Sequence, residues 1–204
     1  LKKVILIPDS FKGTLSSGQI CRIMEKKVKE YFPKCEAVKV PVADGGEGSV
    51  DCFLAAVGGE KKRVMVKGPY MEEMEAFYGI LPDGTAVIEM AACASLPLVE
   101  GRQNPEKTTT YGVGQLMLDA AESGCKKIVV GLGGSCTNDA GAGAAAAAGI
   151  RFYDASGTAF IPTGGTLKKV VRISLESMDE RLKKIPVVTM CDIDNPMYGK
   201  SGAA

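Results

Sequence analysis

The chain has 204 residues, and its apolar and charged fractions of 46% and 24% are those of an ordinary water-soluble protein. Its 25 basic and 24 acidic residues leave a net charge of +1, which provides no field for collecting nucleic acid or an anionic membrane surface. No stretch reaches the roughly 18 consecutive apolar residues of a membrane span, and the apolar start at residues 4–7 is too short for a signal peptide. We therefore expect one large domain or two small ones, with no nucleic acid or membrane partner.

The histidine and cysteine content narrows the chemistry. The chain contains no histidine, which excludes Ser–His and Cys–His catalysis and histidine metal sites within these residues. A general base would therefore be a carboxylate, a lysine or a tyrosine. The seven cysteines are dispersed, odd in number and never spaced as Cys-x-x-Cys, so neither a disulfide framework nor a thiolate zinc site is expected. This pattern favours a reducing, cytoplasmic location.

The N-terminal residues predict a βα unit. Residues 4–7 are typical of a strand, and the polar loop 9–14 follows them. Ser16 and Gln19 have the spacing of a capping box, which starts an amphipathic helix that Pro33 ends.

A second βα unit follows directly. Residues 37–41 predict its strand, 43–48 a glycine-containing loop, and 50–57 a helix with one apolar face. Two successive βα units predict a parallel sheet whose loops meet at the carboxyl ends of the strands, where open α/β sheets bind ligands.

The pattern changes to antiparallel strands near residue 63. Residues 63–67, 75–80 and 86–90 predict strands joined by Gly-Pro and Pro-Asp-Gly turns. We therefore place a domain boundary here, between residues 1–67 and residues 68–204.

The rest of the second domain alternates helices and strands again. Residues 113–121 predict a helix and 128–130 a short buried strand, followed by a glycine-rich loop and an alanine-rich helix at 144–148. Residues 185–190 predict a last buried strand, which leads into the acidic loop 192–195.

The glycine-rich loop favours an anion site. A strand, a glycine loop and a helix together direct backbone N–H groups and the positive end of a helix at one point. Glycines that merely permit a tight turn and close packing are the alternative, and Cys136 breaks the dinucleotide fingerprint at its third glycine. The neighbouring polar side chains favour a ligand, because a packing turn does not need them: Ser135, Thr137, Asn138 and Asp139.

Four polar loops follow predicted strands: 9–14, 44–48, 135–143 and 192–195. Each alone is equally typical of a surface turn, and Lys12 by itself is equally a solvated lysine. Together they supply the groups that phosphoryl transfer requires. These are Lys12 for phosphate charge, the backbone N–H groups of Gly45, Gly46, Gly133 and Gly134 for phosphate oxygens, and Asp44, Asp139, Asp192 and Asp194 for Mg²⁺ or a hydroxyl proton.

The same loops resemble the signature stretches of the bacterial type I glycerate kinases. The similarity covers the whole chain in order, at residues 8–16, 41–48, 108–112, 131–143 and 191–196. It implies transfer of the γ-phosphoryl group of ATP, with Mg²⁺, to D-glycerate. The expected product is phosphoglycerate, with 2-phosphoglycerate preferred over 3-phosphoglycerate, and the hydroxyl that is phosphorylated stays open. The resemblance also implies an α/β fold of two domains, with the substrate in the cleft between them. One domain would be Rossmann-like, with three layers and a parallel sheet, and the other would have a mixed sheet.

The resemblance assigns roles to individual residues. Asp192, Lys12 and Asp44 are the expected catalytic residues, with Asp192 the preferred base, and Asp194 is the expected metal ligand. The remaining residues are expected to bind substrate or nucleotide: Asp9, Ser10, Gly45, Gly46, Glu47, Thr109, Thr110, Gly133, Gly134, Ser135, Asn138 and Asp139.

Members of this family extend well beyond residue 204, so the sequence is expected to be part of a longer protein whose Rossmann-like sheet is unfinished here. Three alternatives stay open. The acceptor can be another small hydroxy acid or a polyol, or the chain can be a nucleotide- or anion-binding module without chemistry. An NAD-dependent dehydrogenase is the least favoured, because the fingerprint and a histidine are lacking.

Overall fold

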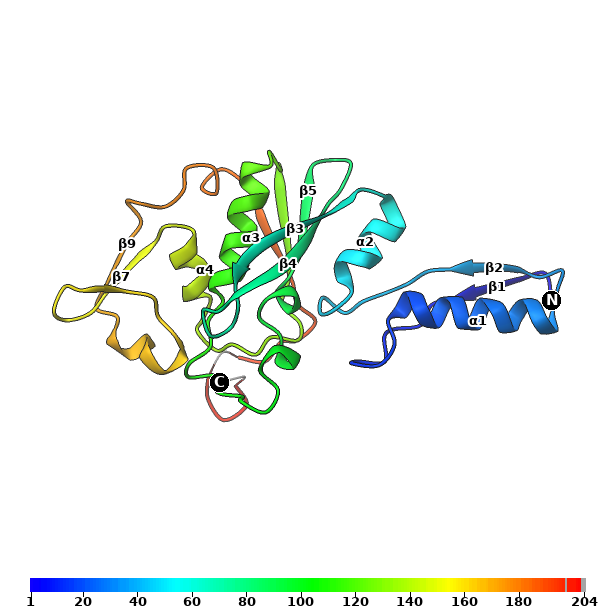
Figure 1. Ribbon diagram of the computed structural model, residues 1–204, viewed down its shortest axis with the longest axis horizontal. Helices are drawn as coiled ribbons and strands as arrows, with labels where there is room; N and C mark the ends of the chain where they lie inside the picture. Colours follow the sequence, from blue (N-terminus) through cyan, green and yellow to red (C-terminus); the bar gives the residue numbers. More distant parts are fainter. Residues whose placement is uncertain (197, 203–204) are drawn as a thin grey trace.

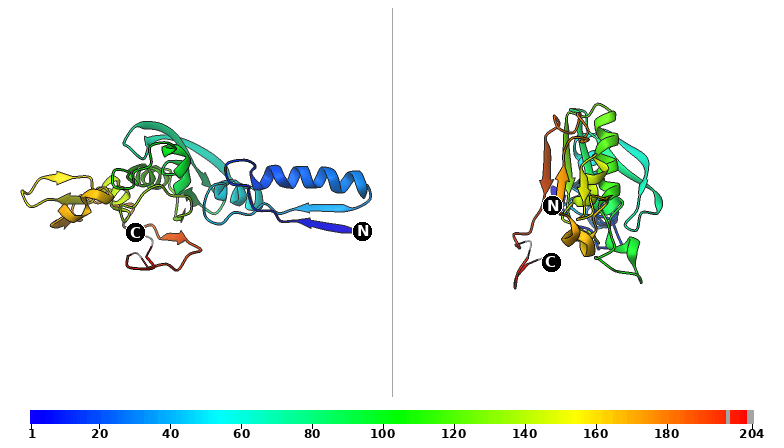
Figure 2. Two further views of the ribbon diagram at one scale, coloured as in Figure 1. Left: turned by 90° about the horizontal axis from the view of Figure 1, so that it is seen from below. Right: turned by 90° about the vertical axis from the view of Figure 1, so that its left-hand side faces the viewer.

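Three β-sheets follow one another along the long axis of the molecule, as the views in Figures 1 and 2 agree. The computed structural model describes residues 1–196 and 198–202. A two-stranded sheet (β1-β2) lies at one end, a three-stranded sheet (β8-β7-β9) at the other, and a five-stranded sheet (β10-β6-β5-β4-β3) between them. The α/β class predicted from the sequence is confirmed.

The N-terminal unit contains β1 (Lys3–Leu6), α1 (Ser17–Tyr31) and β2 (Glu36–Lys39). The two strands pair in parallel, as predicted. The predicted capping box is present, since the Gln19 N–H donates to Ser16 Oγ at 3.3 Å and the Ser16 N–H donates to Gln19 Oε1 at 2.7 Å. The start of α1 is therefore determined by a local sequence signal, the capping box.

Helix α1 covers one face of the two-stranded sheet. Leu6 is buried on that face with Ile20 and Cys21 of the helix. Side chains alternate along a strand, so Ile5 and Ile7 lie on the opposite face, where each is 58% exposed. Of the three layers predicted for a Rossmann-like domain, the described residues of this unit therefore form two.

The central sheet is mixed, as predicted. Its strands β3 (Glu60–Lys67), β4 (Glu73–Ile80) and β5 (Thr85–Glu89) are antiparallel neighbours. Strands β6 (Lys127–Gly131) and β10 (Val187–Met190) continue the sheet parallel to β5. The carboxyl ends of β5, β6 and β10 therefore lie at one edge.

Helices cover both faces of this sheet. Ile88 of β5 packs in the larger core with α3 (Tyr111–Glu122), whereas its neighbour Val87 packs with Val50 of α2 (Ser49–Val57). Adjacent strand residues point to opposite faces, so α2 and α3 lie on opposite sides of the sheet. None of the helices in the described part of the chain is both long and apolar enough to cross a membrane.

Two elements assigned to the domain 1–67 from the sequence pack with the central sheet instead. Strand β3 pairs with β4 along its whole length, and α2 contacts β5, β4 and β3. Strand β3 pairs with β4 because one short turn joins the two strands. Helix α2 packs on this sheet because Phe77 and Val87 provide an apolar surface for it. The packing therefore changes between β2 and α2, before the predicted boundary.

Helix α4 (Ala142–Ala147) packs closely against α3. A Cβ atom at Gly114 of α3 would overlap the Ala144 carbonyl oxygen and lie 2.8 Å from Ala147 Cβ. The alanine-rich sequence of α4 and the glycine of α3 are therefore what allow the two backbones to approach.

The remaining elements form the far end of the molecule. Strands β7 (Arg151–Tyr153), β8 (Ala159–Phe160) and β9 (Arg172–Ser174) are antiparallel, and a 3₁₀ helix, η3 (Gly164–Lys169), lies between β8 and β9.

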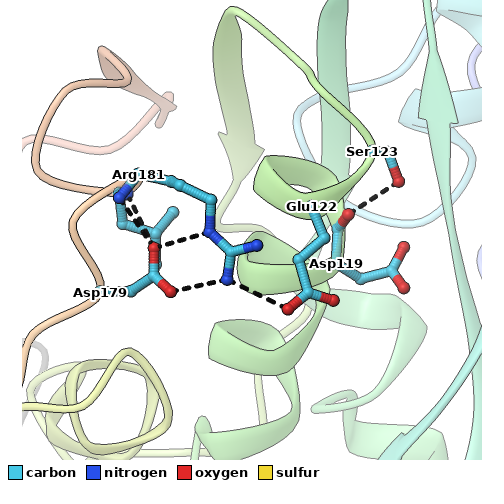
Figure 3. A network of polar contacts seen from close by, with 6 residues as sticks. Asp119, Glu122, Ser123, Asp179 and Arg181 are labelled. Atoms are coloured by element: carbon cyan, nitrogen blue, oxygen red, sulfur yellow. Dashed lines mark hydrogen bonds and ion pairs between the residues drawn. The ribbon is translucent and has the colours of Figure 1, made fainter.

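An ion-pair network ties the segment after β9 to helix α3. Figure 3 shows Arg181 between Asp179 and Glu122, with its Nη2 atom 2.7 Å from Asp179 Oδ2 and 3.1 Å from Glu122 Oε1. Beside it, Leu182 is buried in the main core. The segment therefore leads back to the sheet and into β10.

The prediction that the last strand is buried was wrong. Val187 and Val188 of β10 are 43% and 45% exposed. β10 is the edge strand beside β6, so it has one hydrogen-bonded neighbour, and an apolar sequence alone does not distinguish such a strand from a central one.

Candidate functional site

The loops that follow β1 and β2 meet through an ion pair. Lys12 Nζ lies 2.7 Å from Asp44 Oδ2, and both side chains are about half exposed. The hydrogen bond to Asp44 raises the pKa of Lys12 above its ordinary value, and the same bond lowers the pKa of Asp44. Two of the four predicted loops are therefore brought together.

The loop after β2 also packs against the glycine-rich loop after β6. The Gly133 N–H donates to the Gly45 carbonyl at 3.1 Å, and the Leu132 N–H donates to the Met190 carbonyl of β10 at 3.1 Å. A Cβ atom at Gly131 would overlap the Gly45 carbonyl oxygen. Glycine is therefore required where the two loop backbones touch, beside the end of β10.

Two of the amides predicted to bind phosphate already have partners in the protein. Gly46 N–H donates to Asp44 Oδ1 at 3.0 Å, and Gly133 N–H is bonded to Gly45. For Gly133, the alternative of close packing describes the structure, and the Gly46 amide is satisfied by Asp44 of its own loop. Gly134, in the left-handed region with φ of 74°, lines a cavity.

Asp139 differs most from the prediction. Its side chain is 1% exposed and accepts hydrogen bonds from backbone N–H groups of Thr110 (2.8 Å), Gly143 (3.1 Å) and Gly141 (3.1 Å). The hydroxyls of Thr110 and Thr109 donate to it as well, at 2.9 and 3.3 Å. The anion at the start of α4 is thus the protein's own carboxylate. Asp139, Thr109 and Thr110 form an internal network instead of a ligand-facing surface.

The rest of the glycine-rich loop is tied to a neighbouring segment. Cys136 N–H donates to the Ala94 carbonyl at 2.8 Å, and Ser135 Oγ lies 2.8 Å from Thr137 Oγ1. Asn138 is exposed. Of the polar set at 135–139, only Asp139 is buried within the network at the start of α4.

The acidic loop after β10 lies at the surface. Asp192 and Asp194 are exposed and line neither cavity described below. Among the described residues, no group of three or more His, Cys, Asp or Glu side chains is placed to hold a metal ion. The roles predicted for Asp192 and Asp194 stay predictions.

Two cavities open where the loops meet. We name them the Lys12 cavity, of about 610 Å³, and the Arg22 cavity, of about 570 Å³. The Lys12 cavity is lined by Lys12, Gly13, Asp44, Gly46, Glu47, Phe77, Glu89, Ala91, Ala92, Ser95, Leu96, Pro97 and Gly134. The polar and charged lining of the Arg22 cavity is Ser10, Thr14, Ser16, Ser17, Gln19, Arg22, Glu47, Asp51, Cys52 and Glu89.

The predicted residues Asp9 and Ser10 lie beside the Arg22 cavity. Asp9 is exposed and accepts a hydrogen bond from the Ser10 N–H at 2.6 Å. Ser10 Oγ is buried and lacks a hydrogen-bond partner among the described residues, although it lines the cavity. Ser10 and Glu47 therefore line a space large enough for a small ligand, and their binding roles stay predictions.

Sequence reasoning missed Glu89, which lines both cavities. It ends β5, is 2% exposed, and its Oε2 atom accepts the Val50 N–H at 3.1 Å. Burial raises the pKa of its carboxyl group. The signal was present in the sequence, since an acidic residue ends an otherwise apolar strand. Two short 3₁₀ helices, η1 (Met90–Ala92) and η2 (Leu96–Val99), follow it and complete the wall of the Lys12 cavity.

The chain is similar in sequence to bacterial glycerate kinases. It is 45% identical over 204 residues to a glycerate kinase of Bacillus cereus ATCC 10987, covering 99% of this chain and 54% of the relative. It is 43% identical to the glycerate 2-kinase of Escherichia coli K12, with 99% and 54% covered. The chain therefore spans about half the length of these curated relatives.

A solved structure and a protein family also match. The crystal structure of a candidate glycerate kinase 2 from Salmonella typhimurium LT2 is similar with a TM-score of 0.84 and 38% identity, covering 99% of this chain and 55% of that one. Residues 4–204 match the glycerate kinase family. The order of the loops, the fold and these similarities lead to one conclusion: the chain belongs to the glycerate kinase family.

Proposed function

We propose that the full-length protein transfers the γ-phosphoryl group of ATP to a hydroxyl of D-glycerate. The observation that carries this is the meeting of three strand-end loops around Lys12 and Asp44, between two cavities of small-molecule size. Two cavities suit a reaction with two substrates, and Lys12 supplies positive charge for their anionic groups. The names of the relatives from Bacillus cereus and Escherichia coli support this choice of acceptor.

Mg²⁺ enters this proposal as part of the MgATP substrate. The described residues offer no group of three ligands, and Asp44 is already paired with Lys12. This fits the usual behaviour of Mg²⁺, which keeps several waters and is held by substrate phosphates with one or two carboxylates. When bound, the ion neutralises charge on the transferred phosphoryl group.

The proposed product is 2-phosphoglycerate, supported by the name of the Escherichia coli relative, glycerate 2-kinase. Proton-coupled ³¹P NMR of the product separates the two isomers. A phosphate on C2 couples to one proton and gives a doublet, whereas a phosphate on C3 couples to two protons and gives a triplet.

The function itself is tested by ADP production from the full-length protein with MgATP and D-glycerate. Glycerol and L-glycerate are matched acceptors that lack the carboxylate or invert the stereocentre. A higher turnover rate with D-glycerate than with glycerol or L-glycerate supports the proposal. A higher rate with glycerol would identify a polyol as the preferred acceptor. Saturable nucleotide binding without ADP production identifies a binding module and overturns the proposal.

A further inference from the structure

Glu89 occupies the wall that the two cavities share. The residues common to both linings are Gly13, Glu47, Phe77 and Glu89. Among these four, Glu47 and Glu89 are acidic, and Glu47 is exposed whereas Glu89 is 2% exposed. Glu89 is thus the buried carboxylate at the junction between the two spaces.

The position of Glu89 is fixed from two directions. It ends the central strand β5, at the edge where the parallel strands terminate, and its Oε2 atom accepts the Val50 N–H at the start of α2. A carboxylate whose position is fixed by a strand and a helix loses little conformational entropy when a substrate binds. Its location is therefore suited to chemistry between ligands in the two cavities.

We propose that Glu89 accepts the proton of the attacking hydroxyl, an inference that rests on the proposed function. As the hydroxyl oxygen forms its bond to the γ-phosphorus of ATP, the bond from that phosphorus to the β,γ-bridging oxygen breaks and ADP leaves. The hydroxyl proton passes to the Glu89 carboxylate and afterwards to solvent. The products are phosphoglycerate, ADP and one proton, so atoms and charge balance.

The surroundings of Glu89 suit a proton acceptor at neutral pH. Burial raises its pKa, while the backbone amides at the start of α2 lower it, and the net shift is upward. A base gains strength as its pKa approaches the working pH, provided that it stays ionised there. The titratable groups that face it from α2, β3 and the two strand-end loops are Asp51, Cys52, Lys61, Lys12, Asp44 and Glu47.

Asp192, the base predicted from the sequence, is placed differently. It is exposed in the segment after β10 and lines neither cavity. A competing role for Glu89 is purely structural, because its bond to Val50 caps helix α2, whose own N-cap residue, Gly48, has no side chain to do so. The experiment must therefore separate proton transfer from capping.

Glu89→Gln in the full-length protein makes this separation. Glutamine keeps an oxygen that accepts the Val50 N–H but cannot accept a proton at neutral pH. We expect kcat with D-glycerate and MgATP to fall by about 10²-fold or more, with the thermal midpoint and ADP affinity retained. Glu60→Gln, at an exposed position of β3 outside both cavities, is the matched control and keeps the wild-type rate.

The pH dependence of kcat is the second readout. Protonated Glu89 cannot accept a proton, so the wild-type rate falls as pH drops through its raised pKa, and Glu89→Gln lacks this acid limb. Glu89→Asp, which restores a carboxylate, regains part of the rate and the limb. A Glu89→Gln rate within twofold of wild type, or an unchanged acid limb, overturns the inference while the proposed function stands. An inactive wild-type protein overturns the proposed function itself.

Discussion

Lys12 illustrates a residue whose contact with the protein does little for stability. Its ion pair with Asp44 has side chains 53% and 40% exposed, and such pairs contribute about 0–1 kcal/mol. The pair instead fixes the position of a cation in the lining of the Lys12 cavity.

We therefore expect Lys12→Ala in the full-length protein to lower kcat/KM by about 10²- to 10³-fold, with little change in thermal midpoint. Steady-state kinetics and differential scanning calorimetry check both parts. Lys34→Ala, an exposed lysine of the N-terminal unit outside both cavities, is the control. Asp192→Asn should cost much less, and a loss for Lys12→Ala as small as that for Asp192→Asn would contradict the role of Lys12.

Asp139 illustrates the opposite case, a carboxylate whose contacts are all structural. It joins the start of α3 to the start of α4 through backbone and hydroxyl donors, in a place that water does not reach. Substitution leaves several buried donors without their acceptor.

For Asp139→Asn we expect a loss of about 3 kcal/mol in the free energy of unfolding, because an amide NH₂ group then faces N–H donors. Urea denaturation followed by circular dichroism measures it. Asp83→Asn, in the exposed turn before β5, should leave the midpoint unchanged. If Asp139→Asn keeps the wild-type stability but loses substrate affinity, Asp139 is a binding residue and this structural account is wrong.

At the scale of elements, the contact between α3 and α4 depends on small residues. Gly114 and the alanines of α4 let the two backbones approach until a single methyl group no longer fits. The same approach brings the Ala144 amide at the start of α4 within reach of Thr110 Oγ1.

Gly114→Ala should therefore destabilise the fold by about 1–3 kcal/mol through overpacking, although alanine is the better helix former. Gly18→Ala in α1 is the matched control, because the nearest atom to its added Cβ is Arg22 Nη1 at 3.9 Å. It should stabilise helix α1 by about 0.5–1 kcal/mol. Opposite shifts in the urea midpoint support this account, and two stabilising shifts would contradict it.

At the scale of the whole molecule, burial is concentrated in the middle. All five residues of β5 are buried, whereas β1 and β2 at one end have few buried side chains and an exposed apolar face (Figures 1 and 2). The free energy of local unfolding increases with the number of buried apolar contacts. It should therefore decrease from the central sheet toward the N-terminal unit.

Hydrogen–deuterium exchange of the 204-residue chain, read by mass spectrometry, tests this gradient. Amides of β1 and β2 should exchange well before those of β5 and β6, after each rate is corrected for the intrinsic exchange rate of that amide. Exchange of both sheets in one cooperative step would show that the N-terminal unit does not open independently of the central sheet.

Much of the architecture could be predicted because its signals are local. The capping box at Ser16 and the turn that joins β3 to β4 each follow from a few neighbouring residues. The parallel pairing of β1 and β2 follows from the succession of two βα units, each of which has local signals. The strand-end loops also contained the groups that line the cavities, such as Lys12 and Glu47.

The sequence by itself determined the order and type of the elements and the family resemblance, because periodicity, capping and turn chemistry act over a few residues. Only the tertiary structure decided which polar groups face a ligand. The Asp139–Thr110 bond joins residues 29 apart, and the Glu89–Val50 bond joins residues 39 apart. Contacts over such separations depend on how helices and strands pack. They turned Asp139 inward, left the edge strand β10 exposed, and placed Glu89 between two cavities.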